Sequence, residues 1–245
     1  MRAEKNTCLP ADDKKRLAAV IPVFNHGTTV SGVVLETLKL CVPVIVVDDG
    51  STDSTPGELQ KIEGITLLRH SVNRGKGAAI LTGMACAANS ANWIITIDAD
   101  GQHDPLDAKK LIQAIPKTKR PIIVGNRKGM LEAQAPWTSR FGREFSNFWV
   151  RISGGPRIAD SQSGFRIYPF PESLDLDVKA RRFQFEIEIL VKANLARIPV
   201  LEVPVSVTYN PNTKRISHFH PFFDFLRNFG TFTRLIFYRV TGIRV

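Results

Sequence analysis

Cysteine is scarce in this chain, and long apolar runs are missing from it. The 245 residues include three cysteines, Cys8, Cys41 and Cys86, which are scattered and form no CxxC pair. This spacing favours neither a disulfide framework nor a zinc site, and it is typical of a reducing cytosol. There is no run of about 18 apolar residues, so we expect no membrane-spanning helix. The first residues lack the apolar core of a secretory signal, and we therefore expect a cytoplasmic protein.

Acidic residues are outnumbered by basic ones. The chain has 33 Lys and Arg against 23 Asp and Glu, a formal net charge of +10 at pH 7. This balance indicates an anionic partner: nucleic acid, anionic lipid or a phosphorylated substrate. The 43% hydrophobic content is that of an ordinary globular protein, which excludes a disordered or fibrous chain.

Short apolar runs alternate with amphipathic stretches from residue 17 onward. Strands rich in Val and Ile are predicted at 17–24, 42–49, 64–70, 92–100 and 120–126. Their near-continuous apolar character predicts burial on both faces, as in a parallel sheet. Helices are predicted between them at 27–40, 53–62, 76–91 and 104–116. This alternation predicts an α/β fold with a Rossmann-like, mostly parallel central sheet and helices on both faces.

The regular alternation of strands and helices ends after residue 126. Beyond it, helices are predicted near 141–152 and 183–194 and a strand at 198–207. In the C-terminal segment an apolar helical face includes Phe229, Phe237 and Val240 and is flanked by Arg234. Two interpretations stay open for this helix: it lies on anionic lipid, or it docks on its own domain. We expect a polar tail at 1–16, the α/β domain at 17–210 and a basic, aromatic, amphipathic segment at 211–245.

Two acidic clusters follow predicted strands, DDGSTD at 48–53 and DADGQHD at 98–104. In an open α/β sheet, ligands bind at the carboxyl ends of the strands. Crowded carboxylates repel one another unless a cation or ligand hydroxyls offset the charge. Asp98 and Asp100 can point into one site, and such oxygen ligands suit Mg²⁺ or Mn²⁺ on a substrate diphosphate. Asp-rich turns also cap helices, so either cluster alone has a structural explanation as well.

Basic residues elsewhere favour phosphate. The segment NRGKGA at 73–78 opens a predicted helix with two cations and free N–H groups, although it is not a Walker A sequence. Further arginines, each by itself more typical of a solvated surface, follow at Arg127, Arg140, Arg166 and Arg215. Two glutamates, Glu186 and Glu188, lie two residues apart on a predicted helix and therefore cannot share a face; either could reach the site.

Six segments in a fixed order carry a resemblance: IPVFN (21–25), VVDDGSTDST (46–55), NRGKGAA (73–79), IDADGQHDP (97–105), GNR (125–127) and DSQSGFRIYP (160–169). Together they resemble the family-2 inverting glycosyltransferases of GT-A fold, specifically the dolichyl-phosphate or polyprenyl-phosphate mannose and glucose synthases. The resemblance covers about residues 17–217. It implies a GT-A fold and transfer of a hexose from GDP-mannose or UDP-glucose to a polyprenyl phosphate, with Mg²⁺ or Mn²⁺ as cofactor.

The resemblance also implies roles for individual residues. Those implied to bind the nucleotide-sugar are Pro22, Asn25, Asp48, Asp49, Arg74, Lys76, Asp98, Ala99, Asp100 and Gln102. Those implied to hold the metal are Asp98, Asp100 and Gln102. Those implied to bind the acceptor phosphate are Arg127, Arg140, Arg215, Ser163 and Gly164, and the catalytic candidates are Asp100, Asp160 and Arg127.

The acceptor decides whether a general base is needed. A phosphate monoester, with a second pKa of about 6, is mostly dianionic at pH 7 and needs positioning by arginines rather than deprotonation. A saccharide or lipid hydroxyl would need a base, and Asp160 is then the candidate. We expect inversion at the anomeric carbon, on an enzyme held peripherally at the inner face of a membrane by its C-terminal segment.

Two alternatives come from other functional classes. A net charge of +10 with an aromatic, basic C-terminal segment could indicate a nucleic-acid-binding module. The acidic strand ends would repel a phosphate backbone unless filled by metal, so we expect no nucleic-acid partner. A sugar-nucleotide sensor without turnover is disfavoured by the complete DxD set.

Overall fold

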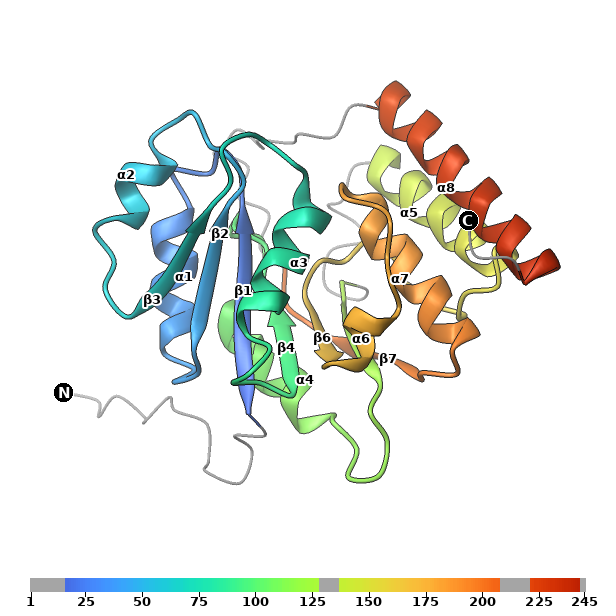
Figure 1. Ribbon diagram of the computed structural model, residues 1–245, viewed down its shortest axis with the longest axis horizontal. Helices are drawn as coiled ribbons and strands as arrows, with labels where there is room; N and C mark the ends of the chain where they lie inside the picture. Colours follow the sequence, from blue (N-terminus) through green and yellow to red (C-terminus); the bar gives the residue numbers. More distant parts are fainter. Residues whose placement is uncertain (1–15, 128–136, 208–220, 243–245) are drawn as a thin grey trace.

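The computed structural model describes residues 16–127, 137–207 and 221–242, with only the backbone for 137–141 and 221–228. A seven-stranded sheet of order β3-β2-β1-β4-β6-β5-β7 forms its centre (Figure 1). The strands are β1 Leu17–Val23, β2 Val44–Asp48, β3 Ile65–Arg69, β4 Trp93–Thr96, β5 Ile122–Asn126, β6 Arg166–Pro169 and β7 Val200–Pro204. Every pairing is parallel except those of β6, which runs antiparallel between β4 and β5. The predicted mostly parallel α/β sheet is confirmed.

Helices cover both faces of the sheet (Figure 1). They are α1 Val30–Leu38, α2 Thr55–Leu59, α3 Lys76–Cys86, α4 Ala108–Gln113, α5 Trp137–Ile152, α6 Glu172–Asp175, α7 Gln184–Leu195 and α8 Pro221–Thr241. Side chains of a strand alternate between faces, and this divides the core in two. Ala19 and Ile21 of β1 pack in one core with α1, α2 and α4, and Ala18 and Val20 pack in the other with α3 and α7.

Two strand predictions need correction. The segment 64–70 was expected to be buried on both faces, but β3 ends the sheet, and Thr66, Leu67 and Arg69 are exposed. An edge strand has one neighbour and needs less cover, and its apolar residues alone do not reveal this position. Strand β6 was not predicted at all, because its four residues follow directly on a loop and are too few to show a period.

The C-terminal helix α8 docks on the rest of the chain. Phe232 and Leu235 are buried with Val150 of α5 and Ile187 of α7, and the Phe232 ring stacks on Trp149 with centroids 5.7 Å apart. The apolar face predicted from the sequence is a different one, which stays outside this contact. Docking and an outward apolar face therefore coexist in one helix.

None of the described helices combines the length and the apolar character that a membrane-spanning segment requires. Cys86 is a free, exposed thiol, whereas Cys41 is disulfide-bonded, which the scattered spacing did not predict. The boundaries 1–16, 17–210 and 211–245 stay predictions, since residues 1–15 and 208–220 lie outside the described ranges.

Candidate active site

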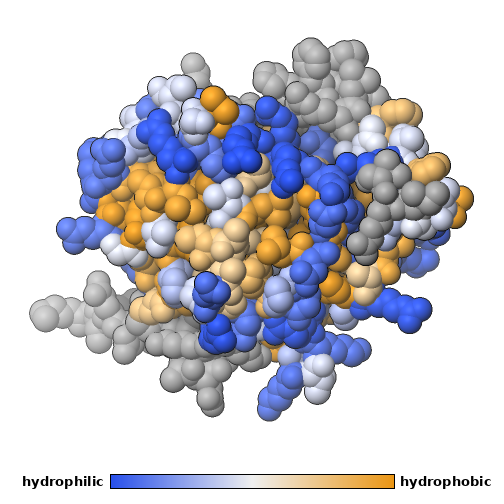
Figure 2. All heavy atoms as spheres, viewed as in Figure 1, coloured by the Kyte–Doolittle hydropathy of each residue, from blue (hydrophilic) through white to orange (hydrophobic). Residues whose placement is uncertain are grey.

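The predicted site residues gather at the edge where β1, β2 and β4 end. Hydrophilic side chains line this upper rim of the molecule in the view of Figure 2. The loops at the rim are tied to one another by short hydrogen bonds. Thr29 Oγ1 donates to the carbonyl oxygen of Ala99 over 2.6 Å, and Thr96 Oγ1 donates to that of Gly164 over 2.7 Å. The rim is therefore a connected surface rather than a set of independent loops.

The DxD carboxylates follow β4 and have opposite pKa shifts. Burial favours the neutral form of Asp98, but the adjacent Lys76 charge outweighs it and holds the pKa of Asp98 below its ordinary value. Burial and the negative charge of Asp98 raise the pKa of Asp100. The Oδ1 atom of Asp100 accepts the backbone N–H of Gln102 at 2.9 Å. Two carboxylates crowded in this way would be stabilised by a further cation.

One cation already lies at this pair. Lys76, the first residue of α3, places its Nζ 2.6 Å from Asp98 Oδ1 and 2.5 Å from Glu186 Oε1. Burial opposes the charge on Lys76, yet the two carboxylates outweigh it and raise its pKa above the ordinary value. Glu186 is thus the glutamate that reaches the site. Glu188 lies instead against Arg234 of α8 and accepts the backbone N–H groups of Lys179 and Ala180.

The end of β2 organises the segment that leads into α3. Both carboxylate oxygens of the buried Asp49 accept backbone N–H groups, from Arg74 at 2.9 Å and Gly75 at 2.7 Å. His70 Nδ1 lies 2.6 Å from the same carboxylate. Asp49 therefore holds the loop that positions Lys76, a structural role that the resemblance did not imply. A contact between Asp49 and the nucleotide stays a prediction.

Two buried acceptors mark the predicted nucleotide end of the site. Asp48 Oδ1 accepts the N–H of Ser51, whereas Asp48 Oδ2 makes no hydrogen bond in the described part of the chain and has only Arg69 Nε at 3.4 Å. Asn73 Oδ1 is likewise buried without a hydrogen-bond partner there. Unpaired buried acceptors are costly, and N–H or O–H donors of a ligand would satisfy them. Contact of this end of the site with a nucleobase stays a prediction. Asn73 was not among the predicted site residues.

The other predicted donor-side residues have mainly structural contacts. Asn25 Oδ1 accepts the N–H of Thr52 at 2.8 Å and so joins the loop after β1 to the loop after β2. Pro22 is a buried residue of β1, and Arg74 is exposed at the rim. Direct contact of these three with a ligand stays a prediction.

The predicted acceptor side centres on an ion pair. Arg127 donates from Nε and Nη2 to the two carboxylate oxygens of the fully buried Asp160, at 2.6 and 2.8 Å. Burial would raise the pKa of Asp160, but its hydrogen bonds and ion pair with Arg127 hold the pKa below its ordinary value. Glu202 of β7 accepts the backbone N–H groups of Ala159 and Asp160 and so fixes this loop. The sequence did not reveal this role of Glu202, because Glu202 lies 42 residues from Asp160 in the chain.

Ser163 and Gly164 lie next to the DxD sequence. A Cβ atom added at Gly164 would lie 2.4 Å from Lys76 Nζ and 2.5 Å from Asp98 Oδ2, so only glycine allows this approach. Ser163 Oγ is buried without a hydrogen-bond partner among the described residues. The remaining acceptor candidates cannot be placed: Arg215 lies outside the described residues, and of Arg140 only the backbone is described.

His103 is a site residue that the sequence did not single out. Its ring is buried against Phe165, with centroids 5.2 Å apart, and its Nδ1 has no hydrogen-bond partner in the described ranges. Burial lowers the pKa of His103, so the ring is neutral at pH 7. Its position in DADGQHD was the available signal, but a lone histidine beside carboxylates has no distinctive spacing.

The family model for glycosyl transferase family 2 matches residues 18–170, well over half of the chain. This chain belongs to glycosyltransferase family 2. The protein is therefore a member of an enzyme family, and this finding argues against the alternative of a nucleic-acid-binding module. The match includes the DxD sequence and all segments that carried the resemblance.

Relatives of this family-2 glycosyltransferase are known by sequence and structure. It is 30% identical to a UDP-N-acetylglucosamine–dolichyl-phosphate N-acetylglucosaminyltransferase of Methanococcus voltae, over 80% of this chain and 86% of the relative. It is 26% identical to a polyprenol monophosphomannose synthase of Mycolicibacterium smegmatis, over 79% of this chain and 78% of the relative. The crystal structure of a glucosyl-3-phosphoglycerate synthase from Mycobacterium tuberculosis with Mn²⁺, UDP and phosphoglyceric acid has a TM-score of 0.67 at 19% identity, covering 93% and 79% of the two chains. This neighbour confirms the GT-A fold.

The residues of the glycosyltransferase fit a divalent metal that is shared with a substrate. Asp98 and Asp100 are crowded carboxylates, yet no group of three His, Cys, Asp or Glu able to hold a metal occurs in the described part of the chain. Mg²⁺ is commonly bound by one or two carboxylates together with substrate phosphates and water. The donor set therefore suits a metal that is completed by a diphosphate.

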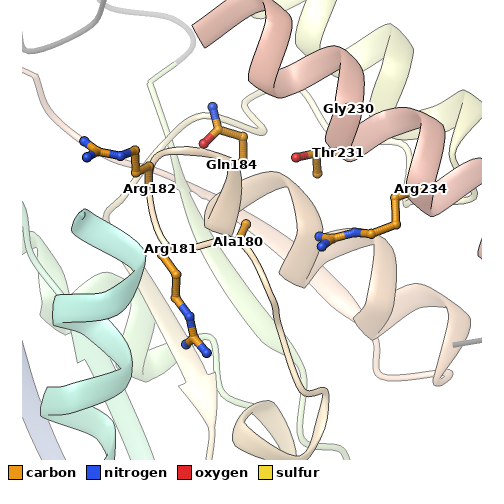
Figure 3. Close-up of a pocket in the computed structure, with 7 residues that line it drawn as sticks. All are labelled: Ala180, Arg181, Arg182, Gln184, Gly230, Thr231 and Arg234. Atoms are coloured by element: carbon orange, nitrogen blue, oxygen red, sulfur yellow. The ribbon is translucent and has the colours of Figure 1, made fainter. Parts of the chain in front are cut away.

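A separate pocket of about 360 Å³ lies between the start of α7 and α8 (Figure 3). It is lined by Ala180, Arg181, Arg182, Gln184, Gly230, Thr231 and Arg234. In this view the side chain of Arg182 points to the left, where α3 lies, and that of Arg181 points downward, so both extend away from α8. None of the DxD residues lines this pocket, so it is not the predicted donor site.

Proposed function

We propose that this glycosyltransferase transfers a sugar from a UDP- or GDP-sugar to a polyprenyl phosphate, with Mg²⁺ or Mn²⁺ bound at Asp98 and Asp100. The observation that carries the proposal is the ion pair of Asp160. The Asp160 carboxylate accepts hydrogen bonds from Nε and Nη2 of Arg127, and its pKa is lowered. It is therefore a weak proton acceptor. A phosphate acceptor needs no base, whereas a hydroxyl acceptor does. Similarity to a dolichyl-phosphate N-acetylglucosaminyltransferase and to a polyprenol monophosphomannose synthase supports the same acceptor class.

The chain's residues divide between donor and acceptor. Asp98 and Asp100, with Gln102, hold the metal, which when bound neutralises charge on the departing diphosphate. Lys76 adds a positive charge at the start of α3, where helix N–H groups also favour anions. The acceptor phosphate is bound opposite the leaving group by Arg127, Arg140 and Arg215, and Asp160 orients Arg127. Attack from that side inverts the anomeric carbon.

The lipid acceptor requires the enzyme to reach a membrane surface, and α8 supplies an apolar face for it. Phe229, Phe237 and Val240 are 58%, 47% and 78% exposed on the side of α8 that does not dock. On the neighbouring helix α5, Phe148 and Ile152 are also exposed. Figure 2 shows apolar residues at the right-hand edge, where α8 lies in Figure 1. With a net charge of +10, this face suits peripheral binding to anionic lipid on the cytoplasmic side.

A transfer assay in detergent tests the proposal. The protein is given Mg²⁺ or Mn²⁺ and sugar-labelled GDP-mannose, UDP-glucose or UDP-N-acetylglucosamine in separate reactions, with polyprenyl phosphate as acceptor. The matched control replaces the acceptor by the free polyprenol, which keeps the lipid and lacks the phosphate. We expect lipid-linked label with the phosphate only and with one donor above the others. Label on the polyprenol, or metal-dependent nucleotide release without lipid product, would favour a hydroxyl acceptor.

A further inference from the structure

The ammonium group of Lys76 lies against the carboxylate that the metal needs. Its Nζ is 2.6 Å from Asp98 Oδ1, within hydrogen-bond distance. A divalent cation on the same carboxylate would lie a few ångströms from this ammonium, and the repulsion between like charges is strong where water is largely excluded. Lys76 and the metal therefore compete for Asp98.

Hydrogen bonds and close packing hold the backbone next to Lys76. Gly75, directly before it, donates its N–H to Asp49 at 2.7 Å. A Cβ atom added at Gly75 would lie 2.4 Å from the carbonyl oxygen of Arg181, and Ala78 donates its N–H to that oxygen at 2.9 Å. The loop that carries Arg181 thus packs directly on the start of α3 (Figure 3). Movement at this point is left to the flexible side chain of Lys76.

Glu186 forms a second ion pair with the same ammonium group. Its Oε1 is 2.5 Å from Lys76 Nζ, and its side chain is only 5% exposed. Glu186 comes from the first turn of α7, whereas Asp98 follows β4, so the two carboxylates hold the ammonium from different elements. Lys76 can release Asp98 and still keep one ion pair.

We propose that the Lys76 ammonium, which contacts both Asp98 and Glu186 in the free enzyme, releases Asp98 and stays paired with Glu186 when metal and nucleoside diphosphate enter together. This inference rests on the proposed function, because it assigns the metal to Asp98. The negative charge of the diphosphate offsets both the metal and the displaced ammonium. Metal alone lacks that compensation and binds weakly, since the described residues offer no third His, Cys, Asp or Glu to complete a site. Glu186 is therefore a positioning residue that acts through Lys76.

The test measures Mn²⁺ binding rather than turnover, by the loss of the electron paramagnetic resonance signal of free Mn²⁺ with the full chain. For the wild type we expect Mn²⁺ affinity to rise at least about tenfold when UDP or GDP is added. Lys76→Met should bind Mn²⁺ alone at least about tenfold more tightly than the wild type and lose most of the nucleotide effect. Glu186→Gln should bind Mn²⁺ alone more weakly, because the ammonium then has Asp98 as its single carboxylate partner.

The double variant Lys76→Met/Glu186→Gln separates this inference from its rivals. It contains neither an unpaired buried Glu186 nor a new carboxylate ligand, and we expect it to keep the tight Mn²⁺ binding of Lys76→Met. Lys110→Met, which removes an exposed lysine paired with Asp107, is the control and should not change Mn²⁺ affinity. Thermal melts verify that each variant is folded.

Each outcome decides the inference. Wild-type Mn²⁺ affinity in both Lys76→Met and the double variant would overturn it and leave the proposed transfer reaction intact. Tight binding in Lys76→Met that is lost in the double variant would show Glu186 to be an added ligand, which also overturns it. If the wild type binds no Mn²⁺ with either nucleotide, the metal dependence of the proposed function fails, and this inference fails with it.

Discussion

At the scale of single residues, the site depends on charges that are buried together and only partly balanced. Lys76 balances Asp98 and Glu186, while Asp100 keeps a raised pKa because Asp98 lies close by. We expect this arrangement of charges to be stable in the free enzyme and to be stabilised further when a cation and an anionic ligand bind together. Removal of one charge should therefore affect ligand binding more than folding.

Asp98→Asn is expected to abolish sugar transfer while the protein stays folded. The change removes the carboxylate that the metal needs, and several kcal/mol of charge stabilisation correspond to a loss of roughly 1,000-fold or more in rate. Lys76 keeps its ion pair with Glu186, so the thermal midpoint should change little. Asp100→Ala should likewise lose activity. Rates near wild type in either variant would exclude the metal assignment.

Gly164→Ala tests the close approach at the floor of the site. The added methyl group would lie 2.4 Å from Lys76 Nζ and 2.5 Å from Asp98 Oδ2, so one of the two must move. We expect at least about tenfold weaker nucleotide binding in the presence of Mn²⁺, a loss of about 1.4 kcal/mol. Gly57→Ala in α2, where an added Cβ meets nothing within 4 Å, is the matched control and should bind as the wild type does.

At the scale of elements, strands that are distant in sequence build the predicted acceptor side. Arg127 follows β5, Asp160 precedes β6, and Glu202 lies in β7 and accepts the N–H of Asp160. The antiparallel insertion of β6 between β4 and β5 brings this loop beside the DxD turn. The ion pair of Arg127 with Asp160 is therefore part of the junction between three strands, and its loss should weaken the fold as well as the site.

Asp160→Asn should lower the free energy of unfolding by about 3 kcal/mol at pH 7, because it leaves the Arg127 charge without its buried partner. The pKa of Asp160 is lower in the folded state than in the unfolded chain. Its stabilisation is therefore present above the unfolded pKa of about 3.9 and is lost as the pH falls through the folded value. Urea unfolding of both proteins should show the difference shrinking below about pH 4.

The control for this prediction is a pair of similar composition near the surface. Arg120 and Glu172 form an ion pair in which each side chain is 37% exposed. Glu172→Gln should cost only about 0–1 kcal/mol. A similarly small effect for Asp160→Asn would mean that the buried pair contributes no more than a surface pair.

At the scale of the whole molecule, two helices that pack on α7, namely α5 and α8, face solvent with part of their apolar surface. The α8 helix docks through Phe232 and Leu235, and its opposite side keeps Phe229, Phe237 and Val240 exposed. Arg239 of α8 donates to the carbonyl oxygen of Ile152 at the end of α5. The two helices thus form one surface, and membrane binding should depend on residues that the fold does not need.

Phe237→Glu should reduce binding to vesicles that contain anionic lipid by at least about tenfold. Burial of a phenylalanine side chain contributes about 2 kcal/mol, and an added carboxylate is repelled by anionic lipid. Cosedimentation with vesicles measures the loss, which should persist at both low and moderate salt. Leu35→Glu, a change of an exposed apolar residue on α1, is the control and should bind as the wild type does. Equal losses in both variants would exclude a specific α8 surface.

The fold class could be predicted from the sequence, and the DxD turn could be recognised there as the candidate metal site. Strand and helix periods are local properties, so six of the seven strands were predicted before any contact was known. The acidic turns after β2 and β4 could also be predicted to lie together, because the carboxyl ends of parallel strands share one edge. The family could be identified because each motif is a contiguous segment of the chain.

Contacts between side chains from distant segments could be found only in the folded structure. It selected Glu186 over Glu188 as the partner of Lys76, because the orientation of α7 depends on packing against α3 and the sheet. It assigned Asp49 to holding a loop and Asp160 to an ion pair, whereas the sequence showed only that both are acidic. The folded structure also shows which face of α8 is docked and which faces outward, and the helical period of apolar residues does not reveal this difference. Pairing between distant segments depends on three-dimensional packing, which local patterns do not record.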